Sequence, residues 1–204
     1  MRKVDLTTNL ISSIAGGGTP ENDTGDARAT AARIYPNALA LDLSGNLVIS
    51  DRGNSKIRRL DITTGILTTI AGSGGIGSDG DGGLATLASL HDPGGVAVDA
   101  GGNVWIADFY AYVVRKVDAA TQIITTVAGN RQSVVLDDGA PATAATLRIP
   151  LGVAVDPAGN LFITDTGNDR IRRVDAATGI INTIAGGGKP ADEIGDGGPA
   201  AMRF

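Results

Sequence analysis

The chain has 204 residues, a formal net charge of −5, 30 glycines, one histidine and no cysteine. The lack of cysteine excludes disulfides, thiolate nucleophiles and cysteine-based zinc sites, and a single histidine excludes any site that needs two imidazoles. The acidic balance argues against nucleic acid or an anionic membrane as the main partner, and no apolar run approaches the ~18 residues of a membrane span.

A repeat of 57 residues organises the chain. The tripeptide at 14–16 returns at 70–72, 127–129 and 184–186, and prolines recur at positions 36, 93 and 150. Self-similarity at such a period is typical of repeat architectures. Division at the prolines predicts, in chain order, a partial unit 1–35 and three longer units, 36–92, 93–149 and 150–204.

Each unit contains short segments with the pattern of β-strands. In the last unit the four segments are 152–156, 161–165, 170–175 and 180–184, separated by turn sequences rich in glycine, asparagine and aspartate. The partial unit 1–35 supplies the third and fourth strands only. Four antiparallel strands followed by a long connection describe one blade of a β-propeller. The sequence therefore predicts an all-β propeller of about three and a half blades.

The strongest unit also resembles a known family. Residues 150–175 fit the pattern Pro-x-Gly-Val-Ala-Val-Asp-x-x-Gly-Asn-x-x-Ile-x-Asp-x-x-Asn-x-x-Ile-Arg-x-Val-Asp, which is similar to the NHL repeat of six-bladed propellers. The glycine-rich stretch 81–88 lengthens the unit and resembles a long-repeat NHL subclass of large bacterial surface or secreted proteins. The first residues of the chain do not lead into a signal-peptide core, so the compartment stays open. The resemblance implies a binding platform, because most NHL propellers are platforms and only a few relatives are enzymes.

One turn departs from the repeat and is the main candidate for binding. After the second strand, 51–56 and 165–170 carry a polar Gly-Asn turn, whereas the middle unit has Phe109, Tyr110 and Tyr112. In a propeller this turn and the long connections emerge on one face. Clustered exposed aromatic residues mark interfaces, which predicts a site for a protein, small-molecule or glycan ligand. The alternative is that the rings pack under the neighbouring connection.

Aspartate recurs at strand ends in every unit, at positions 42, 99 and 156 and again at 51, 108 and 165. We interpret these residues as turn caps that accept backbone N–H groups, because a single metal site does not need its ligand in every blade. The loop at Asp79 and Asp81 lacks the later ligands of an EF-hand. A looser Ca²⁺ site at Asp79 and Asp81, or at Asp137-Asp138, remains open.

Two classes of function fit these observations. The first is a non-catalytic binding or scaffolding module, favoured because the chain shows no nucleophile–base pair and only two glutamates, Glu21 and Glu193. The second is a metal-dependent propeller hydrolase or lyase with its site at the channel mouth. Lactonase-like relatives use a glutamate with Asn and Asp around one ion, and amidating-lyase relatives use histidines and cysteines. Neither set can be placed on this chain, so we predict no catalytic residue, metal site or cofactor.

Three further expectations concern charged residues and closure. The Arg-Lys pairs of the third strands, such as Arg115-Lys116, are predicted to be solvated on outer strands. His91 is predicted to be a surface residue. Three and a half blades do not close a six-bladed ring, and the strand near Met1 presents an open edge. We therefore expect either a homodimer that completes the ring or a fragment of a larger propeller.

Overall fold

Antiparallel strands joined by tight turns make up most of the chain. The computed structural model describes residues 1–19, 27–132 and 138–187. Its strands are β1 (Arg2–Val4), β2 (Ile11–Ser13), β3 (Ala27–Arg28), β4 (Pro36–Leu41), β5 (Leu47–Asp51), β6 (Lys56–Leu60), β7 (Ile66–Ala71), β8 (Pro93–Val98), β9 (Val104–Asp108), β10 (Val113–Val117), β11 (Ile124–Ala128), β12 (Ala140–Pro141), β13 (Pro150–Val155), β14 (Leu161–Asp165), β15 (Arg170–Val174) and β16 (Ile180–Gly186). The described part also holds the one-turn 3-10 helices η2 (Arg52–Asn54), η3 (Ala85–Leu87), η4 (Phe109–Ala111) and η5 (Thr166–Asn168). None of these helices is long enough to cross a membrane.

Three sheets repeat one four-strand order. The first blade has the order β4-β5-β6-β7, the middle blade β8-β9-β10-β11 and the last blade β13-β14-β15-β16. All neighbouring strands pair antiparallel, and each blade begins at one of the recurring prolines. The predicted all-β class with four-stranded antiparallel blades is confirmed.

Aspartate and glycine build the turn between the first and second strands of each blade. The Asp99 carboxylate accepts a hydrogen bond from the backbone N–H of Gly101 at 2.9 Å. Gly102 follows with a φ of +80°, a conformation that glycine adopts without steric cost. The first and last blades repeat the cap with Asp42 and Asp156. The interpretation of these aspartates as turn caps is confirmed.

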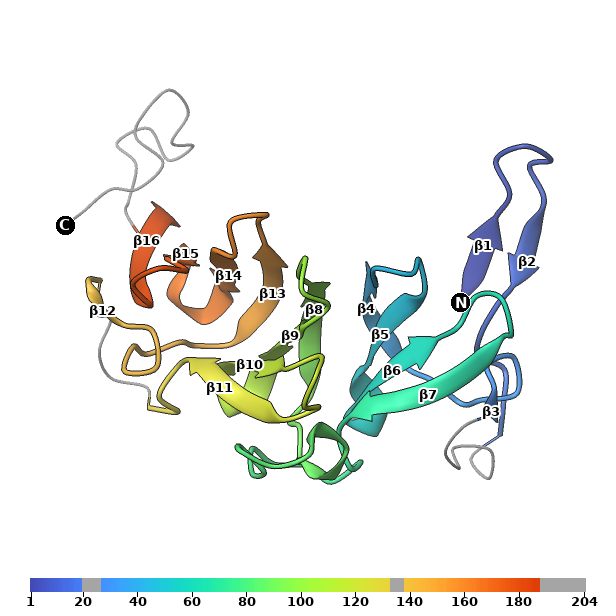
Figure 1. Cartoon of the computed structure of the whole chain (residues 1–204), viewed down its shortest axis with the longest axis horizontal. Coiled ribbons are helices and arrows are strands. Elements are labelled where there is room, and N and C mark those ends of the chain that lie inside the picture. Colours follow the sequence, from blue (N-terminus) through green and yellow to red (C-terminus); the bar gives the residue numbers. More distant parts are fainter. Residues whose placement is uncertain (20–26, 133–137, 188–204) are drawn as a thin grey trace.

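The blades pack face to face, with their first strands closest to one another. Figure 1 shows β4, β8 and β13 side by side in the middle of an open arc, with β7, β11 and β16 at its periphery. One apolar cluster joins the first and middle blades, and another joins the middle and last blades. A Cβ on Gly94 would lie only 2.7 Å from the carbonyl oxygen of Leu151. The buried Ser50 hydroxyl adds a polar link, because it donates to the carbonyl oxygen of Pro93 at 2.7 Å.

Each long connection folds onto the outer edge of the blade that follows it. β3 pairs with β7, and β12 pairs with β16. In the middle blade a bridge between Leu84 and Ile123 occupies the same place. The outermost strand is therefore covered where it would otherwise offer free hydrogen-bonding groups. The sequence did not predict this additional strand, because a strand of two residues is too short to show the alternation of apolar and polar residues that marks a strand.

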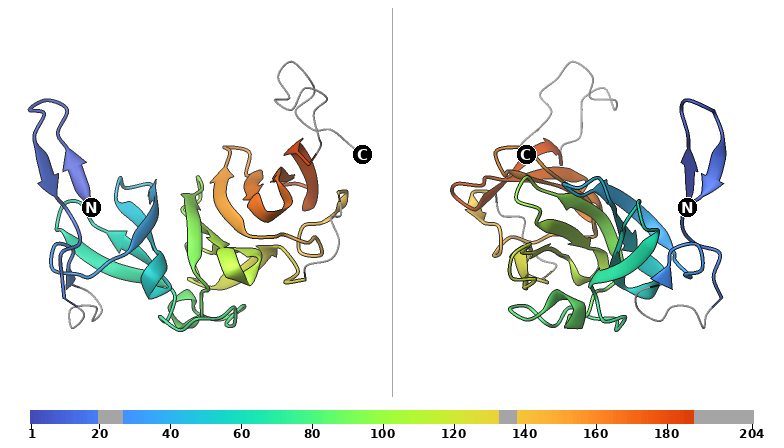
Figure 2. Two further views of the ribbon diagram at one scale, coloured as in Figure 1. Left: turned by 180° about the vertical axis from the view of Figure 1, so that it is seen from behind. Right: turned by 45° about the vertical axis from the view of Figure 1, so that its right-hand side comes forward.

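The β1–β2 hairpin stands at the N-terminal end of the arc (Figure 2). Its base packs against the first blade through a cluster that includes Ile14 and Ala15. Beyond this contact, Leu39 and Leu41 of β4 are 52% and 63% exposed. The equivalent Val96 of the middle blade is buried against the first blade. The face of β4 that would meet a preceding blade is therefore largely open.

Candidate binding face

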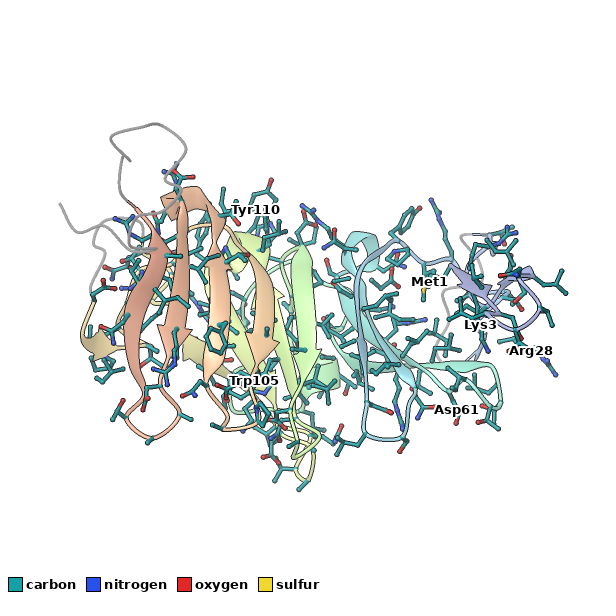
Figure 3. The ribbon with its side chains drawn as sticks, turned by 90° about the horizontal axis from the view of Figure 1, so that it is seen from above. Met1, Lys3, Arg28, Asp61, Trp105 and Tyr110 are labelled. Atoms are coloured by element: carbon teal, nitrogen blue, oxygen red, sulfur yellow. The ribbon has the colours of Figure 1, made fainter. Side chains whose placement is uncertain are left out.

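The strand directions give the molecule two faces. The turns η2, η4 and η5, which follow the second strands, lie at one end of the blades, here called the upper face. The turns between first and second strands, and between third and fourth strands, lie at the opposite lower face. Figure 3 shows Tyr110 at the upper face and Trp105 and Asp61 at the lower face. The backbone N–H of Tyr110 donates to the carbonyl oxygen of His91 at 3.1 Å, which places the end of the preceding connection on the upper face too.

The aromatic turn of the middle blade lies on this upper face. Phe109 and Tyr110 belong to η4, and their rings meet edge to face with centroids 4.6 Å apart. Tyr112 follows with a φ of +60°, a left-handed conformation that Ser55 and Asp169 adopt in the other blades. Phe109 and Tyr112 are half-buried, whereas Tyr110 is 44% exposed. The rings of Phe109 and Tyr112 are therefore partly packed against the protein, and the ring of Tyr110 is the most accessible of the three.

Residues from the neighbouring first blade extend this turn into a cluster. The guanidinium carbon of Arg52 lies 4.9 Å from the centroid of the Phe109 ring, a cation–π distance. Arg52 also forms an ion pair with Asp92 at 3.1 Å. The His91 ring lies 5.3 Å from the Tyr110 ring and is half-buried. His91 thus supports the exposed tyrosine and is more than the surface residue that the sequence predicted.

A hollow of about 630 Å³ opens beside the cluster, lined by Tyr35, Arg52 and Asp92 among others. Tyr35 is 42% exposed, and the guanidinium of Arg33 lies over its ring at 5.0 Å. The hollow is broadly open to solvent, so it offers a contact surface and not an enclosed cavity. The sequence analysis did not select Tyr35. The signal was present, because the equivalent positions of the next two units hold Asp92 and Ile149, so an aromatic residue there departs from the repeat.

The first and last blades show how the ordinary upper turn is held. In the first blade, Asn54 donates from its side-chain amide to Asp51 Oδ2 at 2.9 Å. In the last blade, Asn168 donates to Asp165 Oδ2 at the same distance. Both aspartates are fully buried, so this bond satisfies a carboxylate oxygen that water does not reach.

The middle blade lacks that bond. Asp108 is fully buried, and its Oδ1 accepts the backbone N–H of His91 at 2.7 Å. Ala111 occupies the place of the asparagine, and Asp108 Oδ2 has no hydrogen-bond partner. Arg115 approaches that oxygen only to 3.7 Å. Burial raises the pKa of Asp108 to about 6.

The predicted solvation of the third-strand arginines is wrong for one arginine in each blade. Arg58, Arg115 and Arg172 are 0% exposed. Arg115 donates from Nε and Nη2 to Asp81 Oδ1 at 3.1 and 2.7 Å, and Arg172 donates to Asp138 at 3.1 Å. Because Asp81 and Asp138 belong to the long connections before the middle and last blades, these two ion pairs fasten those connections to the blades that follow them.

The same contacts bear on the suggested Ca²⁺ site. The carboxylate of Asp81 is engaged by Arg115, and its Oδ2 also accepts the hydroxyl of Thr126 at 2.6 Å. The described residues contain no group of three or more side chains with metal-ligating character. Asp137 lies outside the described residues, as do both glutamates of the chain.

A smaller hollow of about 310 Å³ lies at the lower face between the first and middle blades. Asp42, Arg59 and Gln122 are among the residues that line it. Arg59 and Asp42 pair there at 2.6 Å. The lower face therefore offers an ion pair similar to that of Arg52 and Asp92, without flanking aromatic residues.

Comparison with known proteins identifies the repeat. Residues 147–173 match the model of the NHL repeat, and residues 76–137 match that of the teneurin NHL domain. Protein SUPPRESSOR OF QUENCHING 1 of Arabidopsis thaliana is 31% identical over 173 residues, which cover 81% of this chain and 16% of that protein. Human NHL repeat-containing protein 2 is 26% identical over 193 residues, which cover 90% of this chain and 26% of that protein. The chain thus spans only a minor part of the length of these relatives.

Solved structures share the fold. A protein of unknown function from Bacteroides thetaiotaomicron superposes with a TM-score of 0.61 and 23% identity, over 84% of this chain and 41% of that one. A gluconolactonase from Xanthomonas campestris superposes with a TM-score of 0.52 and 13% identity, over 75% and 48% of the two chains. At these identities the likeness shows the fold alone. The chain is an NHL-repeat protein whose blades are those of a β-propeller.

Proposed function

We propose that the chain is a non-catalytic binding module whose upper face holds a ligand or partner at the aromatic turn. The observation that carries this proposal is the exposed ring of Tyr110, supported on both sides by Phe109 and His91. The first and last blades have Gly53 and Gly167 at this position. A supported, exposed tyrosine offers a large contact area at little cost in rotamer entropy.

The surroundings of Tyr110 support binding further. Tyr35 and Arg52 flank the neighbouring hollow, and tyrosine and arginine are the residue types enriched at interface positions that carry most binding energy. The exposed aromatic rings come from two adjacent blades. A ligand on the upper face therefore contacts both blades, which act as a rigid platform because a shared apolar cluster joins them.

The alternative is a propeller hydrolase or lyase, and the fold does not decide between the two because one fold hosts many activities. What favours binding is the composition of the hollow. Among its described lining residues the one carboxylate is Asp92, and that group is paired with Arg52. The described lining residues include no serine, histidine or lysine, so they provide no nucleophile with an adjacent base.

Selection of a displayed random-peptide library on the immobilised chain tests the proposal. Tyr110→Gly restores the residue of the other blades, and Leu43→Ala is the matched control because Leu43 is 68% exposed near the lower face. Peptides enriched on the wild-type chain are expected to lose binding to Tyr110→Gly and to keep it with Leu43→Ala. Failure to enrich any peptide, or equal binding to both variants, would contradict the proposal.

The catalytic alternative has its own assay. Hydrolysis of glucono-δ-lactone is followed with added Ca²⁺, Mg²⁺ or Zn²⁺. The rate is expected to equal the uncatalysed rate with every ion. Metal-dependent turnover that Asp92→Asn abolishes would replace the binding proposal with the hydrolase.

A further inference from the structure

The lower face of the blades is acidic. Every blade places two aspartates there, one after the first strand and one after the third: Asp42, Asp61, Asp99, Asp118, Asp156 and Asp175. The backbone N–H of the threonine three residues later holds the pKa of Asp61, Asp118 and Asp175 below its ordinary value. These carboxylates are therefore ionised at neutral pH.

The upper face has the opposite character. Arg52 lies on it in the first blade and Arg170 in the last blade, and Arg33 and Arg148 lie on it at the ends of the connections that precede these blades. All four are at least partly exposed. The aspartates that end the second strands are buried beneath the upper turns. Two accessible aspartates, Asp92 and Asp169, also lie on the upper face. The four arginines outnumber them, so a chain with a net charge of −5 has an excess of positive charge on this face, which points to an anionic partner.

The hollow provides an exchangeable contact at the centre of this surface. Arg52 and Asp92 form their ion pair with side chains that are 33% and 35% exposed. Exposed pairs of this kind contribute little to stability, so an incoming carboxylate displaces Asp92 at low cost. The planar guanidinium of Arg52 is already oriented by the Phe109 ring and suits bidentate binding of a carboxylate. Tyr35 borders the same hollow and offers an apolar surface beside the charge.

We propose that the upper face binds an acidic peptide segment of a partner protein, with one carboxylate on Arg52 and an apolar side chain against Tyr35. This inference rests on the proposed function and names the partner of that same site. A peptide fits better than a small anion because Arg52 belongs to the first blade and Arg170 to the last, with the whole middle blade between them. The aromatic turn of the middle blade lies between the two arginine groups and contacts the apolar residues of the segment.

Fluorescence anisotropy with three labelled probes tests the proposal. The first probe is a short glutamate-rich peptide that contains leucine, the second is the same peptide with glutamine for glutamate, and the third is single-stranded RNA. Arg52→Gln removes the central charge, and Arg59→Gln is its matched control because Arg59 forms the equivalent pair with Asp42 on the lower face. Asp92→Asn removes the competing carboxylate without disturbing Arg52.

The acidic peptide is expected to bind the wild-type chain, and Arg52→Gln is expected to weaken this binding about tenfold. Arg59→Gln is expected to change it less than about twofold, Asp92→Asn to strengthen it, and added salt to weaken it. The inference would be overturned if the glutamine peptide bound as tightly as the acidic peptide, or if Arg59→Gln weakened binding as much as Arg52→Gln. It would also be overturned if the chain preferred RNA, or if self-association occupied the upper face. If peptides selected on the wild-type chain still require Tyr110 but not charge, the acidic partner is refuted while the binding module stands.

Discussion

Replacement of Ala111 by asparagine tests why one buried carboxylate differs from its two counterparts. In the first and last blades the asparagine at this place donates to the second oxygen of the buried aspartate at 2.9 Å. In the middle blade the corresponding oxygen, Asp108 Oδ2, is buried and has no hydrogen-bond partner. Ala111→Asn returns the missing donor to a backbone that has the same turn as its neighbours.

The sign and size of the effect follow from the pKa of Asp108, which burial raises from 3.8 to about 6. A folded-state pKa above the unfolded value means that the folded chain holds the proton more tightly. The contribution of Asp108 to stability is therefore present below about pH 4 and falls as the pH rises to about 6. Two pKa units correspond to about 3 kcal/mol. An amide hydrogen bond to an ionised carboxylate recovers about 1.5–3 kcal/mol, less the rotamer entropy that the new side chain loses.

Ala111→Asn is therefore expected to raise the free energy of unfolding by about 1–2 kcal/mol near neutral pH and to change it little near pH 4. Urea unfolding of both proteins at the two pH values measures the difference. Asn168→Ala makes the reverse change in the last blade and should destabilise the chain near neutral pH. An equal gain at both pH values would refute the reasoning, because improved packing alone does not depend on pH.

Three further substitutions test a contact within a blade, a contact between two blades and the open face of the first blade. Asp81→Asn removes the carboxylate that Arg115 binds inside the middle blade. Urea unfolding should show that the free energy of unfolding falls by about 2 kcal/mol, and an unchanged value would mean that the ion pair does not stabilise the chain. Gly94→Ala brings a methyl group to 2.7 Å from the carbonyl oxygen of Leu151, so circular dichroism should show a lower Tm, and an unchanged Tm would contradict the close approach of β8 and β13. Leu41→Glu places charge on the open face of β4 and should suppress concentration-dependent association in sedimentation velocity. A wild-type chain that sediments as a 20.5 kDa monomer at every concentration would contradict the expected pairing of chains.

The blade architecture was predictable because its turns are encoded locally. Asp99 and Gly102 lie within four residues of each other, and the structure uses both in one turn, the first as a cap and the second at a positive φ. Strand alternation between such turns then leaves few arrangements other than four-stranded antiparallel blades. The pattern repeats in each unit, so a wrongly assigned strand in one unit would disagree with the equivalent segments of the other units. This repetition made the prediction reliable.

The buried arginines were not predictable by the same route. Arg115 and Lys116 are adjacent and look alike in the sequence, yet Arg115 is fully buried and Lys116 is not. Burial of a guanidinium is costly without a hydrogen-bonded carboxylate, and the carboxylate to which Arg115 donates is Asp81, 34 residues earlier in the chain. Only the folded connection brings the two together. Tyr35 is a different case, because the comparison of units already distinguishes it from Asp92 and Ile149 at the equivalent positions.

The middle blade departs from the repeat in a way that stability does not explain. The other blades show that a Gly-Asn turn satisfies the buried aspartate beneath it, yet the middle blade has Tyr110 and Ala111 instead and leaves Asp108 Oδ2 without a hydrogen-bond partner. A buried carboxylate oxygen without a hydrogen bond destabilises the folded state, and folded proteins accept such local costs mainly where function requires a particular surface. The rings gained in exchange lie at the upper face, next to Arg52 and the hollow. This departure from the repeat therefore supports the proposal that the turn binds a partner.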